Sequence, residues 1–152
     1  MAVVQQRSVV AAEGFDYADA FEVPMSKADA RSAEQLVRAG LKGVPRWLGM
    51  VVLVAHRHVL RLGLAPGSSP KHVLGWEILT AEHDSIRLRA TGPLLHGLLV
   101  ASRVPPSSAV LETFVSYRRP LLARIIWTAV APIHRAVVPY LLRRAATASA
   151  GR

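Results

Sequence analysis

The segment at residues 120–144 (PLLARIIWTAVAPIHRAVVPYLLRR) constrains the fold of this chain more than any other stretch. It is long, mostly apolar and free of acidic residues, and its few charges fall on a narrow stripe. A helix with a narrow polar stripe has a wide face to bury. We therefore expect one C-terminal helix that lies across a curved antiparallel sheet built by the preceding chain. Pro132 and Pro139 predict a kink or an interruption in it, because an interior proline removes a backbone hydrogen bond.

Helical periodicity assigns the two sides of this segment. At about 100° per residue, the predicted buried side consists of Leu122, Ile126, Ile133, Val137 and Tyr140. The opposite, polar side consists of Arg124, Thr128, Ala131 and Arg135. His134 falls at the margin of the polar stripe, and no acidic residue follows it along the chain. We expect so wide an apolar face to be enclosed by more than one partner surface.

Periodicity along the rest of the chain predicts a single domain. Residues 1–14 and 148–152 lack a periodic pattern, so we expect flexible tails around a domain at residues 15–147. A first strand at about residues 17–23 places apolar side chains on one face, with Asp19 between them.

Two helices are expected after this strand. Ser32 and Gln35 have the spacing of a capping box, which predicts a helix that runs to about Lys42. Pro45 suits the first turn of a second helix that runs to about Leu62, because its missing N–H is not needed there. The Gly, Ser and Pro residues that follow break all regular structure.

From His72 onward the apolar period changes from helical to two, which is typical of strands. The expected strands lie at about residues 72–78, 86–90, 95–103 and 109–118. Short turns between them imply an antiparallel meander with one buried face. On the other face, Glu77 is expected to pair across strands with Arg87 and Arg89. The predicted fold class is therefore α+β, with the meander packed under the long C-terminal helix.

This order of elements, together with several local motifs, resembles the helix-grip proteins of the START and polyketide-cyclase-like (SRPBCC) superfamily. More narrowly, it resembles a group of small, uncharacterised bacterial proteins of that superfamily. The motifs are DYADAF at residues 16–21, HVLGW at 72–76, TFVSYRRP at 113–120, Trp127, APIHR at 131–135 and VPYLL at 138–142. The resemblance implies an apolar ligand pocket between the terminal helix and the sheet. About five strands are expected where the superfamily usually has six or more, which implies a small or partly filled cavity.

Composition excludes several classes of function. The chain has no cysteine, so disulfides, thiolate metal sites and cysteine catalysis are excluded. The charge of +9 over 152 residues is uneven, because six of the ten acidic residues precede residue 35 and none follows Glu112. Such asymmetry suits an anionic partner, or it reflects an arginine-rich codon usage and a solvated face. The N-terminus lacks a basic start and a long apolar core, and the apolar runs stop short of the roughly 20 residues of a membrane span. We expect a soluble, cytoplasmic protein.

Nucleic-acid binding and metal binding find no support in the motifs. The apolar second helix is unsuited to reading base edges, and Gly40 and Gly43 lack the surrounding pattern of a KH loop. His56 and His58 point to nearly opposite sides of a helix, and no histidine pair has metal-ligand spacing. No cofactor motif is present. We therefore predict no nucleic-acid partner, no metal and no cofactor.

The remaining hypothesis is a small hydrophobic molecule or lipid bound under the terminal helix. The predicted ligand-binding residues are Trp76, Leu88, His96, Tyr117 and Trp127. His96 would be a cavity-lining imidazole capable of acid–base chemistry, or it faces outward or is hydrogen-bonded in the core. No convergent catalytic set is visible, so no catalytic residue is predicted. Two alternatives remain: a cyclase- or hydratase-like enzyme in the same cavity, and a peripheral membrane or partner-binding protein that uses the basic C-terminal helix.

Overall fold

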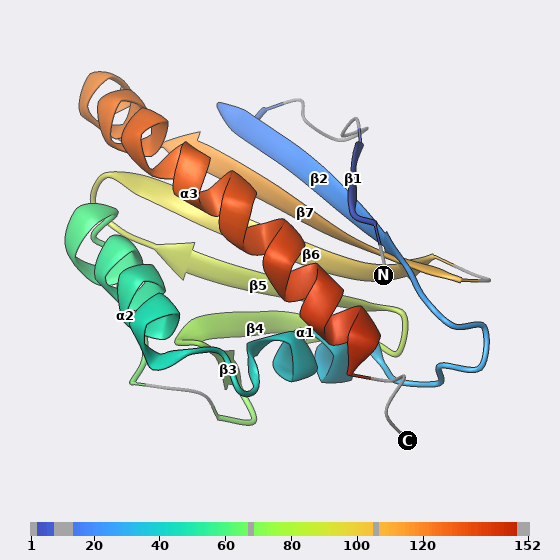
Figure 1. Ribbon diagram of the computed structural model, residues 1–152. Coiled ribbons are helices and arrows are strands. Elements are labelled where there is room, and N and C mark those ends of the chain that lie inside the picture. The colour runs from blue at the N-terminus through green and yellow to red at the C-terminus, as the bar shows by residue number, and fades with distance from the viewer. Residues whose placement is uncertain (1–2, 8–13, 67–68, 105–106, 149–152) are drawn as a thin grey trace.

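The computed structural model of the protein describes residues 3–7, 14–66, 69–104 and 107–148. Figure 1 shows the arrangement of its elements. Two strands come first, then two helices, then a meander of five strands, and a long helix ends the chain. In chain order they are β1 (Gln5–Arg7), β2 (Tyr17–Pro24), α1 (Ala33–Leu41), α2 (Arg46–Val54), the π-helical turn η1 (Ala55–Val59), β3 (His72–Val73), β4 (Trp76–Ala81), β5 (Ser85–Thr91), β6 (Leu95–Val104), β7 (Ser108–Tyr117) and α3 (Pro120–Thr147).

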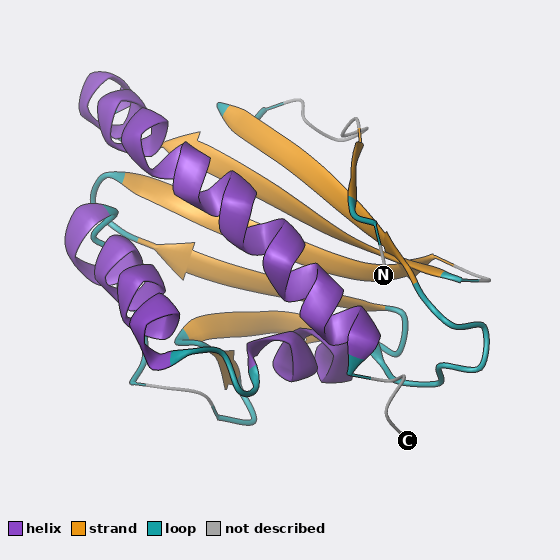
Figure 2. Cartoon of the chain, in the orientation of Figure 1, coloured by secondary structure: helices purple, strands orange, loops and turns teal. Residues whose placement is uncertain are grey.

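The strands form one seven-stranded antiparallel sheet in the order β1-β2-β7-β6-β5-β4-β3. Consecutive strands from β3 to β7 pair as a meander, and β2 returns beside β7. The helices α1 and α2 carry the chain from β2 to the far edge of the sheet, and α3 lies across the sheet (Figures 1 and 2). The predicted α+β class and element order are confirmed, and the arrangement is compatible with a helix-grip fold. The predicted cross-strand pair of Glu77 with Arg89 is present, with nitrogen and oxygen 2.8 Å apart.

The sheet has seven strands where about five were expected. One additional strand is β1, which lies in the predicted N-terminal tail and pairs with β2 although it has no apolar alternation. The other arises because the predicted strand at residues 72–78 is broken by a turn at Leu74 and Gly75. Both residues have positive φ, 51° and 83°, which is the backbone of a tight two-residue hairpin. Glycine supplies one of these conformations without strain, so the Leu-Gly pair interrupts a pattern that otherwise alternates.

The two central helices follow the predicted signals. Ser32 caps α1, and the reciprocal bonds between Ser32 and Gln35 form the predicted capping box. The second helix begins after Pro45 as expected, but its regular α-helical part ends at Val54. The five residues of η1 then continue it as a π-helical turn that ends before Leu62. Such turns occur frequently at functional sites, and this one carries His56.

Helix α3 runs unbroken through both of its interior prolines, so the predicted interruption is wrong. Pro132 and Thr128, whose carbonyl the proline leaves free, are both exposed, so water can satisfy that carbonyl. The buried face also differs from the predicted one, because Ile133 is 42% exposed whereas Ala131 is buried. Trp127 and Val138 mark the centre of the actual buried stripe, which also includes Ala123, Val130, Ala131 and Ala145.

Much of the remaining surface of α3 is apolar and faces outward. By length and composition alone, α3 is the one helix among the described residues that would be long and apolar enough to cross a membrane. In this fold it packs on the sheet and on α1 instead. The prediction that a wide apolar face of α3 is enclosed is therefore wrong. The sheet and α1 cover only a narrow stripe of the helix and leave residues such as Leu121 and Ile125 exposed.

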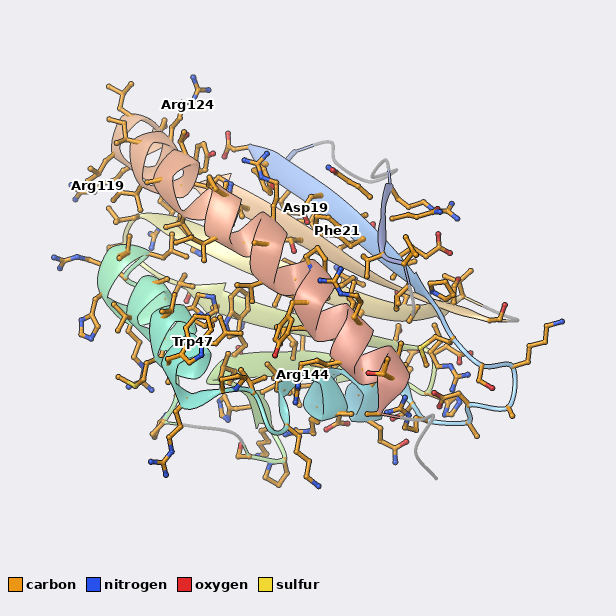
Figure 3. All side chains as sticks on the ribbon, viewed as in Figure 1. Asp19, Phe21, Trp47, Arg119, Arg124 and Arg144 are labelled. Carbon is orange, nitrogen blue, oxygen red and sulfur yellow. The ribbon has the colours of Figure 1, made fainter. Side chains whose placement is uncertain are left out.

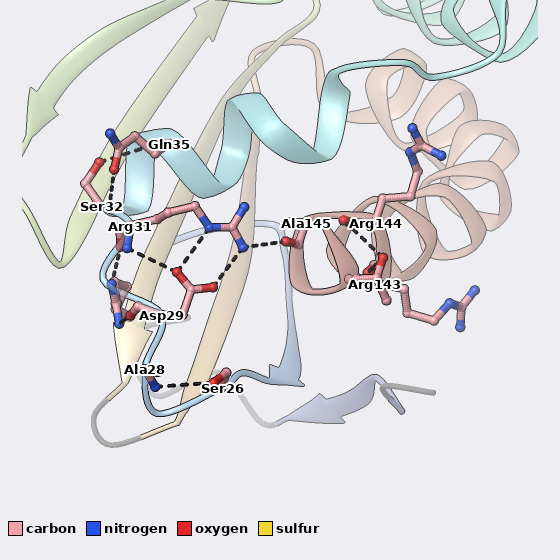
Figure 4. A network of polar contacts seen from close by, with 11 residues as sticks. Ser26, Ala28, Asp29, Arg31, Ser32, Gln35, Arg143, Arg144 and Ala145 are labelled. Carbon is pink, nitrogen blue, oxygen red and sulfur yellow. Dashed lines mark hydrogen bonds and ion pairs between the residues drawn. The ribbon is translucent and has the colours of Figure 1, made fainter. Parts of the chain in front are cut away.

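The C-terminal end of α3 is anchored by a polar network from the loop before α1 (Figure 4). The Arg31 guanidinium pairs with the buried Asp29 carboxylate at 2.8 Å and donates to the Ala145 carbonyl at 2.8 Å. Arg144 donates in turn to the Lys42 carbonyl at the end of α1. These contacts satisfy carbonyls that helix ends leave free, and they fix α3 over the sheet.

Candidate functional site

A cavity of about 180 Å3 lies between the inner face of the sheet, the two central helices and α3. The wall of the cavity is almost entirely apolar. The sheet contributes Trp76, Leu88, Leu95, Gly97, Leu99, Ala101, Thr113 and Val115. The helices contribute Leu36, Val37, Val52, Ala55, His56, Trp127, Val130, His134 and Val138, among others. An apolar cavity of about 150 Å3 is large enough for a single aromatic ring, so this one suits a compact molecule better than a long acyl chain.

Three polar side chains form a buried cluster between β2 and α3, beside this cavity. The His134 Nε2 and the Asp19 Oδ2 are 3.0 Å apart, and both side chains are largely buried. The Tyr17 hydroxyl donates to the same carboxylate oxygen at 2.6 Å. Figure 3 labels Asp19 on β2, next to α3. His134 lines the cavity, whereas Asp19 and Tyr17 lie behind it.

Burial and the neighbouring carboxylate keep Tyr17 in its neutral form. Burial is the largest effect that raises the pKa of the Tyr17 phenol, and its hydrogen bond to Asp19 raises it further. The phenol therefore acts as a hydrogen-bond donor to Asp19 at all ordinary pH values. Its ring also packs edge-on against Trp127, with centroids 5.0 Å apart, so the same side chain supports the apolar and the polar parts of the site.

A second imidazole, that of His56, lines the cavity from the π-helical turn η1. Its ring packs edge-on against Trp76 with centroids 5.6 Å apart, and its Nδ1 accepts a long hydrogen bond from the Trp76 indole at 3.4 Å. Burial, followed by repulsion from His134, lowers the pKa of His56 to about 4. His56 is therefore neutral at physiological pH. As predicted, His58 lies on another side of the turn, and it is exposed.

Three buried polar atoms around the cluster lack a hydrogen-bond partner among the described residues. They are the Trp127 Nε1, the Thr113 Oγ1 and the Asp19 Oδ1. Thr113 lies opposite Asp19 in the register of β2 and β7, and both Thr113 and Trp127 line the cavity. An unsatisfied buried polar group costs roughly 1–3 kcal/mol, so their concentration at one place requires an explanation.

The structure brings three of the five predicted ligand-binding residues together. Trp76, Leu88 and Trp127 all line the cavity, from β4, β5 and α3. The six-membered ring of Trp76 lies against β6 at Gly97, which leaves room for it. Strand alternation turns Trp76 and Leu88 toward the inner face of the sheet, and Trp127 faces them from the buried stripe of α3.

The structure places His96 away from the cavity, as the outward-facing alternative has it. Its neighbours Leu95 and Gly97 line the cavity, and successive side chains of a strand point to opposite faces, so His96 lies on the other face of the sheet. Burial, and then Arg118 and Arg89, lower its pKa there. Tyr117 shares the inner face with Val115 and packs at the edge of the core, but it lies beyond the cavity lining. Burial is the main cause that raises its pKa.

The Asp19–His134 pair was missed, although two signals for it are present in the sequence. Asp19 occupies a position of β2 that alternation assigns to the buried face, and a buried carboxylate requires a partner. His134 follows Trp127 by two helical turns and therefore shares its face. The pair joins residues 115 positions apart, so only the packing of α3 on β2 reveals it.

No group of three or more histidine, aspartate or glutamate side chains in the described part of the chain is placed to hold a metal ion. The site is an apolar cavity with the His134 imidazole on its wall and the Asp19 carboxylate and Tyr17 phenol behind that ring. Such an arrangement can bind an apolar molecule and transfer a proton to or from it.

Comparison with known proteins identifies a family for the chain and no characterised relative. The model of a family described as a protein of unknown function (DUF2867) matches residues 11–141, which is most of the chain. No curated protein matches it.

Proposed function

We propose that this chain, which belongs to the DUF2867 family of proteins of unknown function, binds a small apolar molecule in the cavity beneath α3. The cavity itself is the observation that carries the proposal. Its wall combines aliphatic side chains with two indole rings, from Trp76 and Trp127, which is the composition of pockets for hydrophobic ligands. A helix-grip protein of the START and polyketide-cyclase-like type would use its cavity in this way, and we propose membership of that superfamily and a cytoplasmic location with it.

The volume of about 180 Å3 and the unsatisfied polar atoms define the ligand class. A ligand that fills the apolar space and carries one oxygen atom would accept a hydrogen bond from the Trp127 indole or the Thr113 hydroxyl. It would thereby remove the cost of leaving those groups unpaired. We therefore propose a compact ring compound with a carbonyl or hydroxyl group rather than a long-chain lipid.

Native mass spectrometry and a binding titration test this proposal. We expect purified protein to carry a small co-purifying molecule, and benzyl alcohol to perturb the indole N–H signals of Trp76 and Trp127 in NMR spectra. Ala101, which lines the cavity from β6, provides the variant. Ala101→Phe fills the cavity and is expected to weaken benzyl alcohol binding about tenfold or more, because ring and ligand compete for one space.

Ala81→Phe is the matched control, because Ala81 is exposed at the end of β4. It is expected to bind like wild type. The binding function would be refuted if the purified protein carries no small molecule and its indole N–H signals do not shift with benzyl alcohol up to the solubility limit.

We also propose a second function, docking on an anionic membrane surface, which one specific observation favours. Helix α2 and the first turns of α3 expose large apolar side chains, among them Trp47, Met50, Leu121 and Ile125. No acidic residue lies between Glu34 and Glu77 or after Glu112, so every charged residue of both segments is basic. This composition suits the interface of a membrane with acidic lipids. Since α2 and α3 both border the cavity, such docking would also bring its ligand from the bilayer.

A further inference from the structure

The buried pair of Asp19 and His134 has the geometry of an oriented base. His134 lines the cavity, and Asp19 contacts its Nε2 from behind at 3.0 Å. An ionised carboxylate has no hydrogen to donate, so the shared proton belongs to Nε2. In the form of the ring that can accept a proton, the lone pair therefore lies on Nδ1, to which no described residue donates a hydrogen bond. The carboxylate thus fixes both the tautomer and the orientation of the ring.

Two unpaired hydrogen-bond donors that could bind a developing negative charge belong to residues that line the same cavity. The Trp127 ring lies 5.4 Å from the His134 ring, centroid to centroid, and its indole N–H is buried and unpaired. The Thr113 hydroxyl is likewise buried and unpaired on β7, directly across from Asp19 in the register. Both side chains are more than nine-tenths buried, so a ligand oxygen would meet donors that water does not compete for.

We propose that His134 is the general base of a proton-transfer reaction on a compact apolar carbonyl compound, with Asp19 as its positioning residue. This inference rests on the binding function proposed above and adds a reaction to it. The substrate class follows from the site: an apolar body for the cavity, a carbonyl oxygen for Trp127 and Thr113, and an acidic C–H bond beside that carbonyl for His134.

The reaction requires no partner outside the cavity. The Nδ1 of His134 takes a proton from the carbon next to the carbonyl, the C–H electron pair forms a carbon–carbon double bond, and the carbonyl π pair moves onto oxygen. The resulting enolate oxygen accepts hydrogen bonds from the Trp127 indole and the Thr113 hydroxyl. The imidazolium then returns the proton to that oxygen or to a different carbon. The net change is an isomerisation, so neither an oxidant nor a reductant is consumed.

Three side chains from neighbouring elements surround the pair of Asp19 and His134. From β2, Tyr17 donates to Asp19 and does not ionise, because burial raises its pKa. From η1, His56 faces the same cavity as a neutral ring, because burial lowers its pKa to about 4. Arg135, the next residue of α3, is exposed and is close enough for its charge to act on Tyr17.

Exchange of the α-hydrogens of 2-indanone in D2O, followed by proton NMR, tests the proposal with one defined probe. Wild-type protein is expected to accelerate exchange above the buffer rate, because the N–H of the imidazolium exchanges with solvent before the hydrogen returns to carbon. His134→Gln keeps a donor for Asp19 and is expected to reduce exchange to the buffer rate. Asp19→Asn donates to Nε2 instead of accepting from it, which moves the ring proton to Nδ1, so we expect a loss of about a hundredfold or more.

Binding of 2-indanone, measured separately by the shifts of the tryptophan indole signals, separates this inference from the proposed function. Asp19→Asn is expected to leave the Kd within about threefold of wild type while the exchange rate falls, which a merely structural role would not produce. His58→Gln, an exposed substitution in η1, is the matched control and is expected to retain the wild-type rate.

Three outcomes overturn the proposal. If wild-type protein binds 2-indanone without accelerating exchange, His134 is not a base for this chemistry and the binding function stands; this measurement requires no variant to fold. If His134→Gln exchanges as fast as wild type, another group is the base. If 2-indanone does not bind up to its solubility limit, both the reaction and the ligand class are wrong.

Discussion

At the scale of single residues, Gly97 decides whether an indole ring can lie against β6. A Cβ atom at this position would lie 2.6 Å from the Cη2 of Trp76, which is closer than side-chain carbons approach one another. Trp76 is buried and cannot move aside without losing its contact with His56. The smallest residue of the strand therefore allows its largest neighbour to form the cavity wall.

Gly97→Ala is expected to destabilise the protein by roughly 1–3 kcal/mol through overpacking. Gly49→Ala is the matched control, because a Cβ at Gly49 in α2 meets no atom within 4 Å. Removing a glycine from a helix interior typically stabilises it by roughly 0.5–1 kcal/mol. Urea denaturation of both variants should thus give shifts of opposite sign. A shift of the same sign in both would show that Trp76 does not depend on the space above Gly97.

His56 makes the stability of the fold depend on pH. Its pKa falls from 6.5 to about 4 on folding, so between these values the unfolded chain binds the proton that the folded chain excludes. Stability is therefore fully present at neutral pH and is lost as the pH falls through this window, by about 2 kcal/mol between pH 7 and pH 5. His56→Gln keeps an acceptor for Trp76 and should lose this component. Urea denaturation at both pH values tests the difference; an equal acid loss in wild type and variant would contradict it.

At the scale of elements, the C-terminal end of α3 depends on a side chain that comes from outside the helix. Arg31 joins the buried Asp29 carboxylate to the Ala145 carbonyl, so the loop before α1 holds the last turns of α3 (Figure 4). The helix itself contributes Arg144, which donates to the Lys42 carbonyl, and Thr147, whose hydroxyl donates to the Arg143 carbonyl.

Arg31→Met is expected to destabilise the protein by roughly 2 kcal/mol, because it removes charged hydrogen bonds and leaves Asp29 buried without its guanidinium partner. The last two turns of α3 should exchange their amide hydrogens faster than the rest of the helix. Arg143→Met removes an exposed arginine from the same turn and is the matched control. Uniform amide protection along α3 in the Arg31→Met protein would show that the loop does not anchor this end.

Element order was predictable from the sequence because each element carries its own local signal. The capping box at Ser32 and the change of period at His72 are both read within a few residues. The turn at Leu74 was missed because leucine rarely adopts its positive φ of 51° and because the apolar alternation continues through it. The effect of the prolines in α3 was misjudged, because a proline interrupts a helix less where the carbonyl that it leaves free faces solvent.

The site was less predictable, because its polar part is formed by contacts between distant residues. The pocket that Trp76 and Trp127 line was expected from the family resemblance, because periodicity alone does not predict a cavity. Predicting the pairing of Asp19 with His134 requires knowing which face of α3 points to the sheet. That face was predicted from the positions of the arginines, whereas packing against β2 and α1 determines it. The surface arginines of a basic helix report less on its orientation than its small buried residues, such as Ala123 and Ala131.

At the scale of the whole molecule, charge and exposed apolar surface occur on the same elements. Arg46 precedes Trp47 at the start of α2, and Arg119 and Arg124 flank Leu121 at the start of α3; Figure 3 shows both arginines projecting from that end of the helix. Six of the ten acidic residues precede residue 35, and α2 and α3 contain none, so the charged groups of these two helices are all basic. An anionic bilayer offers both a charged surface and an apolar interior.

Binding to phosphatidylserine-containing vesicles tests this reading in a sedimentation assay. Ile125→Ser is expected to weaken partitioning about tenfold, because it removes the burial of one large side chain that is 68% exposed in the free protein. Leu79→Ser, at an exposed position of β4, is the matched control and should bind like wild type. Raising the salt concentration should release the protein, since arginine–lipid attraction is screened within roughly 10 Å. Equal binding to purely zwitterionic vesicles, or indifference to Ile125→Ser, would exclude membrane docking and leave the cavity to take its ligand from solution.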